Sequence, residues 1–298
     1  MTHIAALNLN SLDISKLISS DDFLQAPEIT GRPGQTPIIR WAGSKKKLLP
    51  ALQLAAPQQF NTYYEPFFGS GIFFLNLRPQ NSVISDLNPH LIQAYKVIKE
   101  HPELLWEATN SISADHDAYY DVRGLPWDTL DEISRAARFI YLNRFCFNGV
   151  YRTNREGGFN VSRGKGCLGI PSLDVFRSFS ESLQTTNIYC ADFESIVNQA
   201  SVGDFVYLDP PYIDLDKRDR GEYGVDSFKF EDLERLVFCV KAASIRGANV
   251  LISYRECPAL ISLLSDWYID RLSVQRSVSC STTKRKRASE IFLSNYIC

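Results

Sequence analysis

The stretch that decides the fold is TYYEPFFGSGIFFLNLRPQNSVISD, residues 62–86. Its first residues, TYYEPF, predict a short strand, and the glycines of FFGSG predict a tight turn directly after it. The apolar IFFLNL predicts a buried helix, and SVISD predicts a second strand that ends in an acid, Asp86. A strand, a helix and a strand in this order are typical of a parallel sheet that is covered by helices.

The rest of the chain continues this alternation. Further strands are predicted at NIYCAD (187–192), DFVYLD (204–209), ANVLISY (248–254) and RASEIFLSNY (287–296). Helices are predicted at NPHLIQAYKVIKEHPELLWEATN (88–110), which begins with the helix-starting pair Asn88 and Pro89, and at FEDLERLVFCVKAASIRG (230–247). We therefore expect an α/β protein with a mostly parallel, doubly wound sheet.

One long segment, residues 91–176, interrupts the alternation. It is helical at first and then rich in glycine, asparagine and arginine, as in NRFCFNGVYRTNREGGFNVSRGKG. This pattern predicts a separate, mainly helical module that is inserted between strands of the sheet. The sheet domain would then consist of residues 37–90 and 177–298, after an N-terminal extension, residues 1–36, that leads into the Gly/Pro-rich GRPGQTP.

Composition limits the class of protein. The chain of 298 residues is 45% hydrophobic and 22% charged, as is usual for a globular protein. No apolar run approaches the ~18 residues of a membrane span, and the N-terminus lacks a secretory signal pattern, so we expect a cytoplasmic protein with no membrane partner. The seven cysteines and four histidines have no ligand-like spacing, so we expect neither a metal site nor a disulfide framework.

Charge is distributed unevenly along the chain. The net charge is −2, but basic residues gather at 40–47, 144–165 and 284–287. Basic patches on a nearly neutral chain suit a protein that binds phosphates on one face. Taken singly, each cluster is more typical of an ordinary solvated surface.

The glycine turn FGSG, residues 68–71, follows a predicted strand. Glycines there let the backbone approach a ligand, and the helix that follows offers free N–H groups. Asp86 ends the next strand, 15 residues after Gly71, where a carboxylate can accept hydrogen bonds from ribose hydroxyls. The segment lacks the third glycine of GxGxxG and therefore favours a nucleoside cofactor over a dinucleotide, although a tight structural turn explains the glycines equally well.

The tetrad Asp209-Pro210-Pro211-Tyr212 follows the apolar strand FVYL, so it is expected at the carboxyl edge of the sheet, where ligands bind. Paired prolines stiffen the backbone, so a carboxylate and a fixed carbonyl offer two acceptors to an –NH₂ group. A tyrosine beside them can stack on a planar ring. The tetrad is thus suited to hold an amino group on an aromatic ring.

These motifs stand in the order WAG-x-K, EPFFGSG, SDLN, a basic insert and DPPY. In this order, and over about residues 37–298, the chain resembles the Dam-type DNA adenine N6-methyltransferases of the α group. The resemblance implies a Rossmann-like methyltransferase fold with an inserted, mainly helical DNA target-recognition domain. It also implies S-adenosyl-L-methionine as cofactor, S-adenosyl-L-homocysteine as product, no metal, and double-stranded DNA as partner. The implied reaction is methyl transfer to N6 of a flipped-out adenine.

The resemblance assigns residues to the cofactor site. Lys45 would neutralise the methionine carboxylate, and Asp86 would bind the ribose. Asp192 and Phe193 would lie beside the cofactor adenine. The full set is Trp41, Lys45, Phe68, Gly69, Gly71, Asp86, Asp192, Phe193 and Asp209.

The resemblance also implies catalytic and DNA-contacting residues. Asp209 matches the catalytic acid, which acts with the carbonyl of Pro210, and Tyr212 matches the residue that stacks on the flipped base. The implied DNA contacts are Arg144, Asn148, Val150, Arg152, Arg155, Lys284 and Arg285. The chain departs from the family where Ser44 replaces a frequent glycine, and where the loop SCSTTKRKR lacks the Asn and Gly of relatives.

Other functions share this chemistry: methylation of RNA adenine, of cytosine N4 or of a protein amide. Asp before PPY favours adenine, and the insert favours duplex DNA. A DNA-binding regulator without activity is a further alternative, which the intact catalytic positions disfavour.

The cellular setting is less constrained by the sequence. The loop NRFCFNGVYR favours GATC or a related site. We expect a bacterial or phage-encoded protein that is a monomer in the cytoplasm and associates with the nucleoid through DNA. A cognate restriction endonuclease or other system component is the expected partner in a restriction–modification role, beside which replication, repair and mobile-element roles stay open.

Overall fold

The computed structural model describes residues 36–154, 157–213, 228–275 and 287–297. Residues 1–35 of the predicted N-terminal extension lie outside this part of the chain, as do the predicted DNA contacts Arg155, Lys284 and Arg285.

Within the described residues, seven strands form one sheet in the order β3-β2-β1-β4-β5-β7-β6. The strands are β1 (Tyr63–Glu65), β2 (Ser82–Asp86), β3 (Thr186–Cys190), β4 (Phe205–Leu208), β5 (Asn249–Arg255), β6 (Tyr268–Gln275) and β7 (Arg287–Ser294). The first five pair in parallel, while β7 runs antiparallel between β5 and β6. The prediction of a mostly parallel α/β sheet is confirmed.

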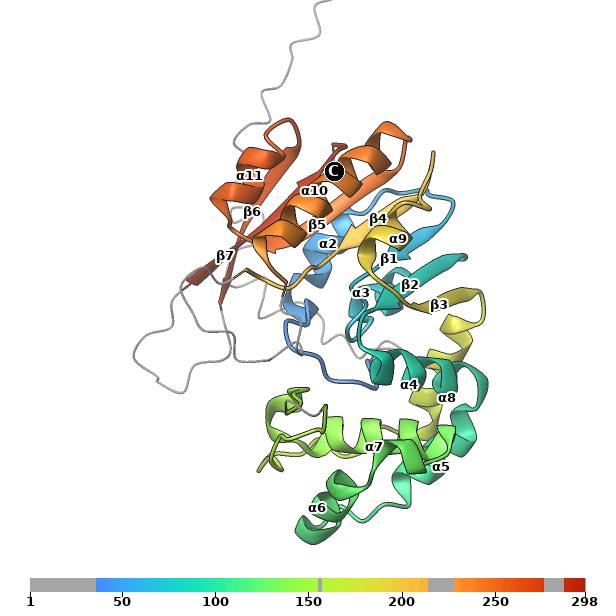
Figure 1. The fold of residues 1–298 in the computed structure, drawn as a ribbon. Coiled ribbons are helices and arrows are strands. Elements are labelled where there is room, and N and C mark those ends of the chain that lie inside the picture. The colour runs from blue at the N-terminus through green and yellow to red at the C-terminus, as the bar shows by residue number, and fades with distance from the viewer. Residues whose placement is uncertain (1–35, 155–156, 214–227, 276–286, 298) are drawn as a thin grey trace, which may run out of the picture.

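Helices cover both faces of the sheet (Figure 1). They are α2 (Leu49–Ala55), α3 (Ile72–Leu77), α4 (Pro89–Glu100), α5 (Pro102–Asn110), α6 (His116–Gly124), α7 (Glu132–Phe145), α8 (Leu173–Leu183), α9 (Phe193–Val197), α10 (Phe230–Ile245) and α11 (Pro258–Leu263), with short 3-10 helices η2 (Lys46–Leu48), η3 (Trp127–Thr129) and η4 (Phe147–Gly149). Along β5, Val250 and Ile252 join the core with α9, α10 and α11, whereas Leu251 joins the core with α2, α3, α4 and α8. The result is a three-layer, Rossmann-like arrangement. No helix in the described part of the chain has the length and apolar composition that crossing a membrane requires.

The prediction of one helix over residues 88–110 is wrong. The structure has two helices there, because α4 ends at Glu100 and α5 begins at Pro102. A proline has no N–H for the helical hydrogen-bond ladder and clashes with the preceding turn. His101 accordingly leaves the helical region, with φ −136° and ψ 53°. The sequence pattern also does not predict β6, which is defined by its antiparallel pairing with β7.

The helices α5, α6 and α7 lie below the sheet in Figure 1. Tyr119 of α6 and Tyr141 and Phe145 of α7 form a small core with Val161, whereas Leu105 of α5 belongs to the larger core that also contains α4 and α8. Helix α4 packs both on α7 and on strands β2 and β3, so it belongs to both parts of the molecule. The predicted boundary at residue 91 falls inside α4, and the division into two domains stays a prediction.

The sheet has a topological switch point between β1 and β4. From β1 the chain continues to β2 and β3 on one side, and β4 then pairs with β1 on the other side. In open α/β sheets the crevice beyond the carboxyl ends of such neighbours binds ligands. The glycine turn 68–71 follows β1 and the tetrad 209–212 follows β4, so the fold brings both features to one crevice.

Candidate active site

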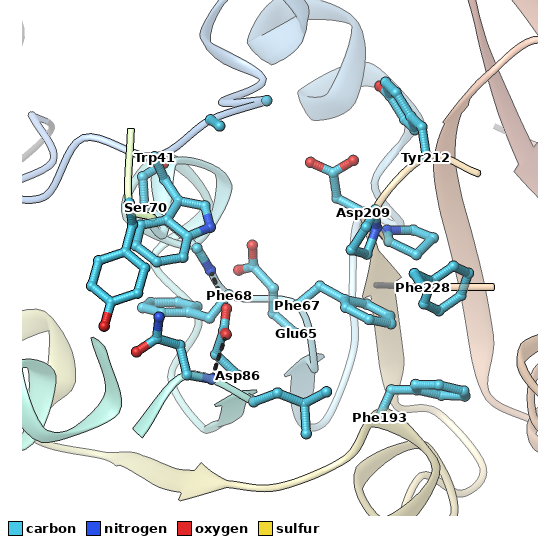
Figure 2. A pocket seen from close by; sticks show the side chains of 18 of the residues that line it. Trp41, Glu65, Phe67, Phe68, Ser70, Asp86, Phe193, Asp209, Tyr212 and Phe228 are labelled. Atoms are coloured by element: carbon cyan, nitrogen blue, oxygen red, sulfur yellow. Dashed lines mark hydrogen bonds between the residues drawn. The ribbon is translucent and has the colours of Figure 1, made fainter. Parts of the chain in front are cut away.

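A cavity of about 950 Å³ lies at this crevice. Its walls come from the residues that follow β1, β2, β3 and β4, from residues 41–45 and 228–235, and from the insert, which contributes Tyr151, Thr153 and Gly157. Figure 2 shows Asp209 and Trp41 on opposite sides of the cavity. Among the described residues, no group of His, Cys, Asp and Glu side chains is arranged to hold a metal ion.

The turn after β1 requires glycine at two positions. Gly69 and Gly71 have φ of 48° and 64°, in the left-handed region. A Cβ at Gly69 would lie 2.7 Å from Cδ1 of Trp41, and one at Gly71 would lie 2.5 Å from Cζ of Phe68. The Gly69 N–H donates to Oδ2 of Asp86 at 3.1 Å. The turn is therefore held against the acid that ends β2.

Backbone groups hold the Asp86 carboxylate. Besides the bond from Gly69, the Asn88 N–H donates to Oδ1 at 3.0 Å. Burial raises the pKa of Asp86 above its usual value, and these N–H donors oppose the rise. Each carboxylate oxygen keeps a second lone pair for a ligand hydroxyl. The structure thus places Asp86 where the sequence predicted it, in the wall of the cavity.

Two side chains hold the acid of the tetrad. Nζ of Lys45 lies 2.6 Å from Oδ1 and 2.8 Å from Oδ2 of Asp209, and the Ser253 hydroxyl donates to Oδ1 at 3.3 Å. Burial raises the pKa of Asp209, and the Lys45 ammonium opposes the rise. Only 7% of the Lys45 side chain is exposed, so solvent screens the pair weakly. The structure therefore pairs Lys45 with the tetrad acid, whereas the sequence expectation paired it with a cofactor carboxylate.

The tyrosine of the tetrad is also constrained. The Tyr212 hydroxyl donates to Oε2 of Glu290 at 2.8 Å. The Tyr212 ring meets the Tyr254 ring edge to face, with centroids 5.0 Å apart and an interplanar angle of 82°. Nζ of Lys45 lies 5.2 Å from the Tyr212 ring centroid. Asp209 and Tyr212 thus both contact Lys45, and both line the same cavity.

An aromatic cluster lines the cavity near β1 and α9 (Figure 2). Phe193 stacks on Phe67 with ring centroids 5.4 Å apart, and Phe228 meets Phe67 edge to face at 6.0 Å. The Arg235 guanidinium lies 4.9 Å from the Phe193 ring centroid and bonds Oδ1 of Asp192 at 2.7 Å. Aromatic rings beside a carboxylate suit a flat base that carries an amino group. Asp192 and Phe193 both line the cavity, and their place beside the cofactor adenine stays a prediction.

Glu65 is a candidate functional residue that the sequence arguments above do not single out. It ends β1, lines the cavity and is 3% exposed. Its Oε2 accepts the Tyr63 hydroxyl at 2.8 Å, and burial raises the pKa of Glu65 well above its usual value. An acid directly before the glycine turn, in EPFFGSG, is the signal that identifies it. Phe228 and Arg235 carry no such local signal, because only the fold brings them to the cavity.

Trp41 and Phe68 have different roles in the wall. The Trp41 ring stacks on Tyr151 of the insert, with centroids 5.8 Å apart and planes at 25°. Phe68 is 2% exposed and packs edge to face against Tyr95 at 4.8 Å. Trp41 therefore links the cavity to the insert, while Phe68 supports the glycine turn from inside.

Three of the predicted DNA contacts lie on the surface loop that supplies part of the cavity wall. Asn148 and Arg152 are exposed, and Val150 is half-buried. Asn148 adopts a left-handed conformation with φ 54°, which asparagine tolerates better than most residues. Nε of Arg152 donates to Oδ1 of Asn160 at 2.8 Å, which leaves its other guanidinium donors for a partner.

The predicted DNA contact at Arg144 is wrong. Arg144 is 7% exposed, and its Nε donates to the Gly169 carbonyl at 2.8 Å. Its Nη1 donates to the Ile38 carbonyl at 3.4 Å, and burial lowers the pKa of Arg144 to about 10. The side chain therefore links two backbone segments in the interior, at Gly169 and at Ile38.

The sheet, the cavity at its switch point and the Asp-Pro-Pro-Tyr tetrad define a Rossmann-like methyltransferase. Residues 41–280 match the family described as D12 class N6 adenine-specific DNA methyltransferase, and the chain belongs to this family of enzymes. The resemblance to the Dam-type enzymes is thereby confirmed.

Curated relatives agree with this assignment. The chain is 36% identical to the type II methyltransferase M1.LlaDCHI of Lactococcus lactis subsp. cremoris, over 87% of this chain and 95% of that protein. It is 33% identical to the DNA N-6-adenine-methyltransferase of Escherichia phage P1, over 85% of this chain but 34% of the phage protein. It is 29% identical to the DNA adenine methylase of Haemophilus influenzae, over 86% of this chain and 92% of that protein.

Proposed function

We propose that the chain transfers a methyl group from S-adenosyl-L-methionine to N6 of an adenine that is flipped out of double-stranded DNA. The observation that carries the proposal is the pairing of Asp209 with Lys45 in a cavity that also contains the glycine turn and Asp86. One cavity thus offers acceptors for an amino group beside a site for a nucleoside.

The residues present fit this cofactor. The left-handed Gly69 and Gly71 leave a surface that side chains would fill. Asp86 would accept bonds from the ribose, and Phe193 with Asp192 would hold the adenine. The buried Glu65 carboxyl would face the cofactor ammonium group. When bound, the cofactor supplies an electrophilic methyl group on a sulfonium sulfur.

The chain would act on the base through hydrogen bonding and charge. Asp209 and the Pro210 carbonyl accept the two N6 hydrogens, which turns the nitrogen lone pair away from the ring system. The methyl group would pass from the cofactor sulfur to N6 as the carbon–sulfur bond breaks, which would leave S-adenosyl-L-homocysteine, and the methylated N6 would release one of its protons. Asp209 stabilises the positive charge that develops on N6, and this effect is strong where the bound substrate excludes water. Lys45 opposes the rise in pKa that burial causes, so it favours the ionised form of Asp209.

A stacked adenine cannot reach this cavity, so the base must leave the duplex at a cost of a few kcal/mol. Tyr212 would recover part of this cost by stacking on the base, which is worth about 1–3 kcal/mol. Asn148 and Arg152 lie on the loop beside the cavity and would contact the flanking DNA. GATC or a related site is the target we propose, in a type II restriction–modification setting such as the name of the Lactococcus relative indicates.

A transfer assay with tritium-labelled cofactor tests the proposal. The substrates are a GATC duplex, a duplex with the target adenine replaced by N6-methyladenine, a cytosine-containing duplex without adenine, and single-stranded RNA. We expect label only in the first duplex. Label in RNA or in the adenine-free duplex would assign the same chemistry to another substrate, and no transfer to any of them would contradict the proposal.

A further inference from the structure

We infer that Tyr254 and Glu290 are positioning residues that set the orientation of the Tyr212 ring for stacking on the target base. The inference rests on the proposed function, because it takes Tyr212 to be the residue that meets the base. The two residues lie on neighbouring strands, β5 and β7, that follow the tetrad in the sequence by more than forty positions.

The tetrad alone does not fix its tyrosine. Pro210 and Pro211 lock their own φ angles, but they leave ψ of Pro211 and the side-chain angles of Tyr212 free. The orientation of the ring must therefore come from contacts with other parts of the fold.

The Tyr254 hydroxyl holds the backbone on both sides of Tyr212. It accepts the Ile213 N–H at 2.8 Å and donates to the Pro211 carbonyl at 3.2 Å. Tyr254 is 1% exposed, so these bonds are made in the interior, where an unpaired partner is costly. Its ring also meets the Tyr212 ring edge to face at 5.0 Å. One side chain thus contacts three consecutive residues.

Glu290 holds the far end of the Tyr212 ring. Its Oε2 accepts the Tyr212 hydroxyl at 2.8 Å, and Glu290 is 9% exposed. A hydrogen bond to a carboxylate is stronger than one between neutral groups. Glu290 lies directly opposite Arg255 in the pairing of β7 with β5, so the register of the sheet fixes its distance from the tetrad.

Strand β5 reinforces this arrangement with each of its last three residues. Ser253 donates to Asp209, Tyr254 bonds the backbone around Tyr212, and Nη2 of Arg255 donates to the Ile213 carbonyl at 2.8 Å. The acid and the tyrosine therefore keep a fixed relation, because one strand holds both. A base that stacks on Tyr212 would present its amino group to Asp209 in that relation.

The test uses the full chain and the variants Tyr254→Phe, Glu290→Ala and Glu290→Gln. Tyr254→Phe keeps the ring and removes both backbone hydrogen bonds, and Glu290→Gln keeps an acceptor for the Tyr212 hydroxyl. Tyr268→Phe is the matched control, because Tyr268 lies on the neighbouring β6 and is 50% exposed. The measurements are kcat, KM for a GATC duplex, cofactor affinity, and the fluorescence of 2-aminopurine at the target position.

We expect Tyr254→Phe and Glu290→Ala to lower kcat by roughly 10- to 100-fold, as small misplacements in active sites do. Cofactor affinity should stay within about twofold, and the 2-aminopurine signal should rise because stacking no longer quenches it. Glu290→Gln should recover most of the activity, and Tyr268→Phe should match the wild type.

Epistasis gives the decisive comparison. If Tyr254 acts through Tyr212, Tyr254→Phe should have no further effect on kcat in a Tyr212→Ala background. Equal kcat losses from Tyr254→Phe in both backgrounds would overturn the inference, as would a Glu290→Gln variant that is no better than Glu290→Ala. A wild-type chain that methylates no adenine duplex would instead contradict the proposed function itself.

Discussion

Nζ of Lys45 lies 2.6 Å from Oδ1 of Asp209, and this ion pair joins the residue before η2 to the residue that follows β4. Lys45 is buried and Asp209 is 20% exposed, so the pair influences the protonation of the acid more than a fully exposed surface pair would. The charge of the Asp209 carboxylate in the cavity therefore depends on Lys45.

Lys45→Met should raise the pKa of Asp209, because it removes the main group that opposes the effect of burial and leaves only the Ser253 hydrogen bond to do so. Activity requires the ionised acid, so the acid limb of kcat/KM should move to higher pH. The measurement is the pH dependence of kcat/KM between pH 5 and 9 for wild type and variant. Lys46→Met removes the same charge from an exposed neighbour and should leave the limb in place. If the acid limb of kcat/KM does not shift in Lys45→Met, the ion pair does not determine the pKa of Asp209.

Gly71→Ala should weaken cofactor binding and lower stability. Its φ of 64° costs an L-residue about 1–2 kcal/mol, and the new Cβ would lie 2.5 Å from Phe68. Calorimetric titration with S-adenosyl-L-methionine and thermal unfolding measure the two effects. Gly124→Ala is the control, since nothing lies within 4 Å of a Cβ there. Wild-type affinity in Gly71→Ala would contradict the role of the turn.

Glu65→Gln should make cofactor-free protein more stable at neutral pH. The folded-state pKa of Glu65 is raised above the usual 4.5, so the folded state binds its proton more tightly than the unfolded state does. The stability that this proton contributes is full below pH about 4.5 and is lost as pH rises through the folded-state pKa. In urea unfolding at pH 4 and pH 8, the difference in the free energy of unfolding between the variant and the wild type should therefore grow with pH. A difference that shrinks with pH would contradict the burial argument.

Arg235→Gln should weaken cofactor binding moderately, because Arg235 holds both Asp192 and the Phe193 ring. The loss should be about 2- to 5-fold in Kd, as for cation–π contacts that solvent reaches. Lys241→Gln on the same helix is the control, since its side chain is equally exposed at 43%. The same titration measures both variants. Equal cofactor affinities for Arg235→Gln and Lys241→Gln would show that Arg235 does not contribute to cofactor binding.

Arg152→Ala and Arg144→Ala should differ in kind. Arg152 is exposed on the loop beside the cavity, so its loss should weaken duplex binding with unchanged thermal stability. Relaxed discrimination between cognate and non-cognate duplexes would indicate a base contact worth about 1–3 kcal/mol, and uniform weakening would indicate a phosphate contact.

Arg144→Ala leaves buried carbonyls unpaired and should cost about 1–3 kcal/mol of stability. Fluorescence anisotropy and urea unfolding separate the two, and a stable Arg144→Ala with a pure DNA defect would restore the sequence prediction.

The sequence predicts the parts of the site that follow strands directly. The glycine turn, Asp86 and the tetrad each stand beside a strand whose apolar pattern is clear, and their meeting at one edge follows from parallel topology. The fold class follows from the same alternation.

The remaining features depend on contacts between distant segments. Tyr254 reaches Tyr212 through the pairing of β5 with β4, and Glu290 reaches it through the pairing of β7 with β5. Arg144 belongs to a basic cluster in sequence, but α7 points it inward towards Ile38. The break at Pro102 interrupts a helical pattern that continues on both sides, so a pattern of apolar residues alone does not predict it.

The central claim is that Asp209 directs methyl transfer to adenine N6. The most direct measurement is mass spectrometry of nucleosides from a GATC duplex after incubation with S-adenosyl-L-methionine and either wild type or Asp209→Ala, with cofactor binding measured in parallel. We expect N6-methyladenine with the wild type, none above background with Asp209→Ala, and cofactor binding that persists at least in part. Appreciable N6-methyladenine from Asp209→Ala, or a methylated base other than adenine from the wild type, would contradict it.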